Sequence, residues 1–209
     1  GGLSAEENTS RLIALQQQMG WHTLEDRTTH IHRSGDSIAL TGVAFSDKLQ
    51  EYRPTLHRRL NLAEENPIFE GEFAAGNGWQ EVKFGEMASG RYICVEMLDT
   101  HSGEDVASIA ELELLGEDGS RLPREEWVAM YADSEERAHE NRTADKVLDL
   151  QESTYWSSDE GDKFPHAVVI DMGEEHTVGG VQYLPRMEQG APGSVKHFKV
   201  YVKSDKFMF

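Results

Sequence analysis

The side chains of this sequence that could do chemistry are histidines, carboxylates and one cysteine. His30 and His32 alternate along a segment typical of a strand, which places both rings on one face, as a zinc site would require. Spacing supplies no third ligand, so surface histidines are the simpler interpretation. The spacing singles out no carboxylate pair for glycosidase chemistry, and the sequence has no nucleophile elbow, phosphate loop or CxxC pair. The residues themselves therefore give no reason to expect catalysis.

Composition narrows the range of partners. A chain of 209 residues has room for one large domain or two small ones. Its 38 acidic residues outnumber the 20 basic ones, which gives a net charge of −18. Nucleic acid and anionic membrane surfaces are disfavoured, because both need clustered Lys and Arg. No apolar run approaches the ~18 residues of a membrane span, so we expect no membrane insertion. A neutral ligand such as a sugar is compatible with this charge.

Alternating apolar and polar residues mark the elements that must position these side chains. The pattern recurs in five segments, residues 91–98, 109–115, 166–172, 177–183 and 197–203. Turn signals rich in Gly, Pro and Asn separate the segments. Short half-buried strands with regular turns predict an all-β fold, an antiparallel β-sandwich.

Two stretches of the chain are versions of each other. The matched pairs are residues 12–23 with 147–158, 41–45 with 179–183, and 57–62 with 197–202. The three matches keep the same order along the chain. A repeat of this length is a whole domain rather than a solenoid unit, which predicts tandem modules.

Several segments carry motifs of a known family. Residues 127–131 resemble an opening strand, residues 143–156 an Ala-x-Asp-Gly-Asp…Thr-x-Trp element, and residues 169–173 a Val-Asp-Leu-Gly strand. Residues 69–115 resemble the closing half of the same domain. The family is that of discoidin domains, which are coagulation factor 5/8 type C-like and include the family 32 carbohydrate-binding modules. The resemblance implies a jelly-roll sandwich of the galactose-binding-domain type.

The two halves of this domain occur in reversed order along the chain. We expect two tandem modules, the first over residues 1–118 without its opening strand and the second over residues 119–209 without its closing strands. The repeat favours this division. The alternative is one permuted sandwich over residues 69–209, with residues 1–68 as an appendage. The first and last strands of the fold lie near each other, so residues 112–115 could lead directly into residues 127–131.

The resemblance also implies where a ligand would bind. Sugar-binding members use an aromatic platform beside polar side chains, in loops at one end of the sandwich. The candidates in the second module are aromatic, basic or acidic: Arg186, Tyr155, His166, Glu188, Asp159 and Glu160. Arg186 stands where the family often places a ligand-contacting Arg, although a structural ion pair is the alternative. An Asn that often follows is missing, since Pro192 and Gly193 occupy that region. Trp156 is expected in the core.

A structural calcium is a weaker expectation. Family members often hold calcium in the Asp-Gly-Asp loop, where carboxylates and carbonyls supply oxygen ligands. Here Asp149-Leu150-Gln151 replaces that motif, so Asp149 alone is retained as a candidate ligand. No other cofactor is expected. Cys94 is the single cysteine, whereas animal members commonly tie their ends with a disulfide. The chain therefore looks more like a bacterial module.

The resemblance implies non-catalytic carbohydrate binding. We expect accessory modules of a larger exported bacterial glycan-degrading enzyme, located in the periplasm, on the cell surface or in the medium. The partners would be a glycan or polysaccharide and an attached catalytic domain that lies outside this chain. The alternative is a structural or protein-docking sandwich that binds no sugar.

Overall fold

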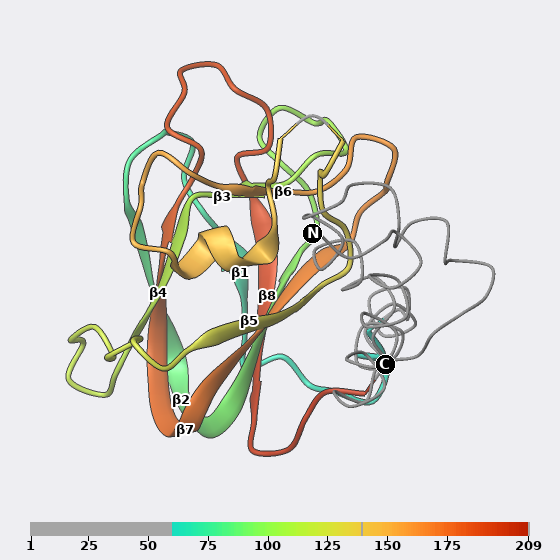
Figure 1. Ribbon diagram of the computed structural model, residues 1–209. Helices are drawn as coiled ribbons and strands as arrows, with labels where there is room; N and C mark the ends of the chain where they lie inside the picture. The colour runs from blue at the N-terminus through green and yellow to red at the C-terminus, as the bar shows by residue number, and fades with distance from the viewer. Residues whose placement is uncertain (1–59, 139, 209) are drawn as a thin grey trace, which may run out of the picture. The chain divides into compact units, whose positions relative to one another are not determined.

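The computed structural model describes residues 60–138 and 140–208, which fold as an antiparallel all-β unit (Figure 1). The strands are β1 (Phe69–Glu72), β2 (Gln80–Met97), β3 (Ser108–Ile109), β4 (Glu111–Leu115), β5 (Val128–Ala132), β6 (Trp156–Ser157), β7 (His166–Leu184) and β8 (His197–Lys203). A short 3-10 helix, η4 (Ala144–Leu148), precedes β6. The predicted fold class is thus confirmed. No helix within these described ranges is long and apolar enough to cross a membrane.

One sheet of six strands dominates the unit. Its order is β1-β8-β2-β7-β4, with β5 also paired to β7, and β3 and β6 form a separate two-stranded sheet. The second half of β2 pairs with the first half of β7, which also pairs with β5. The first half of β2 pairs with the second half of β7, which also pairs with β4. The two long strands therefore contribute to both layers of the sandwich.

The long strands bend where their pairing shifts register. In β2 the shifts lie between Lys83 and Ala88 and between Gly90 and Tyr92. Glycine allows the close backbone approach that this bend requires. A Cβ atom at Gly90 would lie 2.5 Å from the backbone carbon of Lys203. The sheet can fold over because no side chain fills this contact.

Aromatic rings join the two layers in the core. Phe73 stacks on Phe198 of β8 with ring centroids 4.0 Å apart, and its ring lies 4.4 Å from that of Tyr183 in the second half of β7. Trp156 is fully buried in the same cluster, as its sequence position predicted. Each side chain of this size contributes about 1.5–3 kcal/mol when it is buried. The core therefore holds together strands that are distant in the sequence.

One layer consists of the second half of β2, the first half of β7, β5 and β8. Both of its faces are covered, which differs from the half-buried strands predicted for this region. Ile93 and Val95 face the main core, whereas Tyr92 and Cys94 belong to a second apolar cluster. Phe207 belongs to that second cluster, and Leu62 packs against it. The segments that contain Leu62 and Phe207 thus cover the outer face of this layer and shield it from water.

Strands on both sides of the expected boundary at residues 118 and 119 share this sheet. β2 and β4 precede the boundary, and both pair with β7, which follows it. Within residues 60–138 and 140–208 the sheet does not divide at that point, and the segments expected as closing and opening halves pair with each other. This is the layout that the one-sandwich alternative requires. Residues 1–59, with the first repeat segments, His30 and His32, lie outside the described residues.

Candidate functional site

Tyr155 lies between two arginines at one end of the sandwich. The guanidinium carbon of Arg186 is 4.6 Å from the centre of the Tyr155 ring, and that of Arg142 is 4.8 Å away. Tyr155 immediately precedes buried Trp156 of β6, so alternation along the chain directs the two rings to opposite sides. Arg186 follows the end of β7, and Arg142 comes from the loop before η4. Three separate segments thus converge on one aromatic ring.

Carboxylates pair with both arginines of this group. Arg186 forms an ion pair with Glu188, and Arg142 pairs with Glu140 at 2.9 Å. Glu188 and Glu140 are well exposed, whereas the side chain of Arg186 is only 20% exposed. The two cations therefore face three carboxylates, because Glu136 Oε2 also lies 3.8 Å from Arg142 Nε. We call Arg142, Tyr155, Arg186, Glu140 and Glu188 the Tyr155 cluster.

At pH 7 the ionisation states of the cluster provide both hydrogen-bond donors and hydrogen-bond acceptors. Burial raises the pKa of the Tyr155 phenol, and the opposing effect of Arg186 and Arg142 is smaller, so the phenol stays protonated. Burial lowers the pKa of Arg142, but Glu140, Tyr155 and Glu136 together outweigh it and the net shift is upward. The cluster therefore presents a phenol O–H, guanidinium N–H donors and carboxylate acceptors.

Some of this hydrogen-bonding capacity is unused. The Nε atom of Arg186 is buried and has no hydrogen-bond partner among the described residues. The Tyr155 hydroxyl likewise makes no hydrogen bond within the described part of the chain. A buried donor without a partner costs about 1–3 kcal/mol. An oxygen acceptor at this place, from a ligand or from water, would remove that cost.

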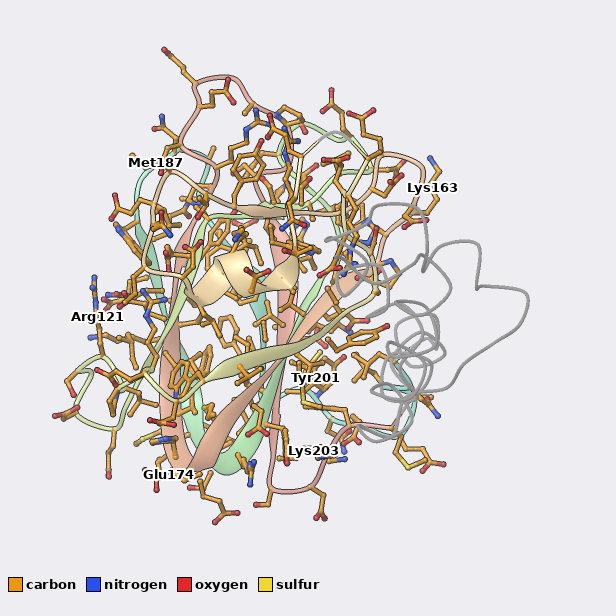
Figure 2. The ribbon with its side chains drawn as sticks, viewed as in Figure 1. Arg121, Lys163, Glu174, Met187, Tyr201 and Lys203 are labelled. Carbon is orange, nitrogen blue, oxygen red and sulfur yellow. The ribbon has the colours of Figure 1, made fainter. Side chains whose placement is uncertain are left out.

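Residues from the first half of the described chain reach the same loops. Asn77 donates a hydrogen bond from Nδ2 to the carbonyl of Met187 at 3.2 Å. Trp79 donates from Nε1 to Glu152 Oε1 at 3.0 Å. Figure 2 shows Met187, which follows Arg186, at the end of the sandwich opposite Glu174. Sequence reasoning missed Asn77, Trp79 and Arg142. The family motif led us to expect an Asn shortly after Arg186. The Asn that reaches these loops is Asn77, which lies far before Arg186 in the chain, so the motif could not identify it.

His166, a sequence candidate for ligand binding, is fully buried. Its Nδ1 lies 2.8 Å from Asp133 Oδ2, and its Nε2 lies 3.3 Å from the carbonyl of Asp105. Burial lowers the pKa of His166, but Asp133, the Asp105 carbonyl and Asp162 together outweigh it and the net shift is upward. The ring is therefore committed to internal contacts and is not open to a ligand.

Asp159 and Glu160 belong to a neighbouring turn. Asp159 Oδ1 accepts a hydrogen bond from the amide of Gly161 at 2.9 Å, and its own amide donates to Ser134 Oγ. Glu160 is exposed. No hydrogen bond or ion pair within the described residues joins either carboxylate to the Tyr155 cluster. The structure thus brings together Arg186, Tyr155 and Glu188, and leaves Asp159, Glu160 and His166 apart from them.

Asp149 is engaged in a local turn. Its Oδ1 accepts from the amide of Gln151 at 3.0 Å, and its Oδ2 accepts from the hydroxyl of Thr154 at 2.7 Å. Lys146 Nζ is 3.9 Å from the same carboxylate. The described residues contain no group of three or more His, Cys, Asp or Glu side chains that could hold a metal. Calcium needs six to eight oxygen ligands, and calcium at Asp149 stays a prediction.

Comparison with known proteins finds a match over the part of the chain that contains the Tyr155 cluster. The family model of the F5/8 type C domain matches residues 130–208. A sialidase from Micromonospora viridifaciens is 34% identical over 73 residues, which are 33% of this chain and 11% of the sialidase. The chain thus matches only about a tenth of that relative's length. The first-half strands β1, β2 and β4 lie outside the family match but complete its sheet. The resemblance seen in the sequence motifs is therefore confirmed for residues 130–208, which match the model of the F5/8 type C, or discoidin, family.

Proposed function

We propose that this unit is a non-catalytic carbohydrate-binding module whose ligand site is the Tyr155 cluster. The F5/8 type C match supports a binding module rather than an enzyme, and the similarity to a sialidase supports a glycan as the ligand. The observation that carries the proposal is the convergence of Arg142, Arg186 and the Tyr155 ring at a loop end, with donors left unused.

The chemistry of the cluster matches a neutral sugar. Guanidinium N–H groups can donate to adjacent hydroxyls, while Glu140 and Glu188 can accept from them, so a polyol satisfies both partners at once. Both guanidiniums already pair with carboxylates, so the cluster does not require an anionic ligand. The Tyr155 ring contacts both guanidiniums and thereby limits the conformations that they would lose on binding.

The wider role that we propose is that of an accessory module. Attached to a catalytic domain of an exported bacterial glycan-degrading enzyme, a weak site keeps that domain near its polysaccharide by raising the effective concentration. The relative supports this role by its name alone, because the similarity covers 11% of the sialidase. A docking module without sugar affinity is the competing proposal, and the Arg186–Glu188 ion pair favours it.

A glycan array on the whole chain, followed by calorimetric titration of each hit, tests the ligand site. Arg186→Ala is expected to weaken a genuine hit by about tenfold or more, because it removes charge-assisted donors. Arg137→Ala is the matched control, since Arg137 is exposed and pairs with Glu135 rather than with the cluster. A blank array with a folded chain, or equal losses in both variants, would contradict the site and favour the docking role.

A further inference from the structure

A pocket lies at the end of the sandwich opposite Met187, the residue that follows Arg186 of the Tyr155 cluster. Its volume is about 350 Å³, which is at the low end of the range for small-molecule sites. The connection between β4 and β5 lines one side, and the bend within β7 at Gly173 lines the other. Glu174, at the rim, is labelled in Figure 2 at the end away from Met187. The pocket is therefore separate from the proposed sugar site.

The pocket has an aromatic and apolar wall. Trp127 and Met172 line it, together with His176, whose ring lies edge-on to Trp127 with centroids 6.2 Å apart. Trp127 is only 7% exposed, and its indole Nε1 has no hydrogen-bond partner among the described residues. An indole N–H that is buried in this way needs an acceptor oxygen.

Negative charge surrounds this wall. Glu125, Glu126 and Glu174 line the pocket, and no Lys or Arg of the described chain lines it. Glu125 and Glu126 form no ion pair or hydrogen bond through their side chains within the described chain. The single ionic neighbour of Glu174 there is His176, 4.0 Å away. Three carboxylates beside apolar walls concentrate cations, because the walls keep out the water that would screen them.

We propose that this pocket binds a small polyhydroxylated primary amine, the chemical class of amino sugars. The ammonium would pair with the three carboxylates and lie near the electron-rich indole. A hydroxyl or ring oxygen would accept from Trp127 Nε1, and the C–H face of the sugar would pack on the aromatic wall. A bare metal ion fits less well, since the described residues offer no metal-binding group of three side chains.

Calorimetric titration with D-glucosamine tests the proposal, with N-acetylglucosamine as the neutral probe of nearly the same shape. Glucosamine is expected to bind saturably and N-acetylglucosamine at least about fivefold more weakly, because acetylation removes the charge. The variant Glu125→Gln/Glu126→Gln/Glu174→Gln is expected to weaken glucosamine by about tenfold. The matched variant Glu104→Gln/Glu117→Gln/Glu160→Gln removes three exposed carboxylates elsewhere and should bind as the parent does.

Two further variants distinguish binding in this pocket from binding at the Tyr155 cluster and from a loss of folding. Trp127→Phe keeps a ring but removes the N–H donor, and it should weaken glucosamine several-fold while thermal unfolding shows a folded chain. Titration in the Arg186→Ala background, which removes binding at the proposed sugar site, should retain a saturable glucosamine site that the Glu125→Gln/Glu126→Gln/Glu174→Gln change weakens, so failure of the proposed sugar site would not affect this result. Absence of saturable binding, equal affinity for both sugars, or equal losses in the two Glu→Gln triples would overturn the proposal.

Discussion

At the scale of single residues, Leu150 occupies a backbone conformation that suits glycine. Its φ angle is +63°, and its side chain is 71% exposed, so it contributes little packing. Residues other than Gly in this left-handed region carry a cost of order 1–3 kcal/mol. Leu150 stands where the family motif has the glycine of Asp-Gly-Asp. The loop therefore has a conformation that glycine adopts most easily, with Leu at that position.

Leu150→Gly is expected to stabilise the fold. Relief of the backbone strain exceeds the added entropy of the unfolded chain, which leaves a gain of about 0.5–1 kcal/mol in the free energy of unfolding. Urea unfolding measures it. The control is Val128→Gly, since Val128 is also exposed but lies in the extended strand β5 and should lose stability on the same change. A loss in both variants would show that Leu150 is unstrained.

The buried pair His166–Asp133 makes stability depend on pH. The pKa of His166 is raised in the folded state, so the pair's contribution is fully present below the unfolded pKa of about 6.5 and is lost as pH rises through the folded pKa. Asp133→Asn should therefore cost more stability at pH 5.5 than at pH 8.5. Urea unfolding at both pH values measures the difference. Glu160→Gln, an exposed change, should show no such dependence, and a constant cost for Asp133→Asn would contradict the ion pair.

The candidate site was only partly accessible to sequence reasoning, for a reason that these residues illustrate. Tyr155 could be assigned outward because Trp156 beside it is the residue expected in the core. Arg142 could not be predicted, because no sequence pattern shows which loop side chain will contact a given aromatic ring. His166 is the first residue of a strand. Its position there does not show which face of the sheet its ring lies on, or whether a carboxylate lies within reach in the interior.

At the scale of elements, β4 buries two glutamates that alternation assigned to solvent. Glu111 is 1% exposed and Glu113 is 7% exposed. Arg124 donates to Glu111 Oε2 at 2.7 Å and lies 3.3 Å from Glu113 Oε1. Burial raises the pKa of Glu111, and Arg124 opposes it. The alternation of apolar and polar residues correctly predicted the strand. It could not show that a neighbouring arginine would cover the polar face of that strand.

Removing Arg124 should destabilise the fold strongly. Arg124→Met leaves Glu111 buried without its partner, with an expected loss of about 3–5 kcal/mol in the free energy of unfolding. The double variant Glu111→Leu/Arg124→Met should recover most of the loss, because no unpaired charge remains. Chemical denaturation of the two variants checks this. Lys163→Met removes an ion pair whose two partners, Lys163 and Asp105, are both exposed, and it should change stability by less than about 1 kcal/mol. Equal stability of the single and double variants would mean that the charge is not the cause.

At the scale of the whole molecule, the sequence showed which segments are strands but not how they pair. The motifs identified 69–115 and 127–206 as two halves of one kind of domain. The repeat then favoured assigning them to different modules, since local patterns carry no information about long-range partners. In the structure, β2 and β7 form the longest pairing and join the halves into one sheet. The core follows the same connection, because Phe73 precedes β2 and packs on residues of β7 and β8.

This connection predicts how fragments of the chain behave. A fragment of residues 119–209 lacks β1, β2 and β4, so β7 and β8 lose their partners and Phe198, Tyr183 and Ile170 lose their cover. It should be unfolded or aggregated, because open strand edges and exposed apolar faces favour association. A fragment of residues 59–209 retains every described strand and should unfold in one cooperative transition. Amide dispersion in NMR spectra and thermal unfolding distinguish the two. A well-dispersed, cooperatively folded 119–209 fragment would instead support a self-sufficient second module, in which case the pairing of β2 with β7 would not be required for folding.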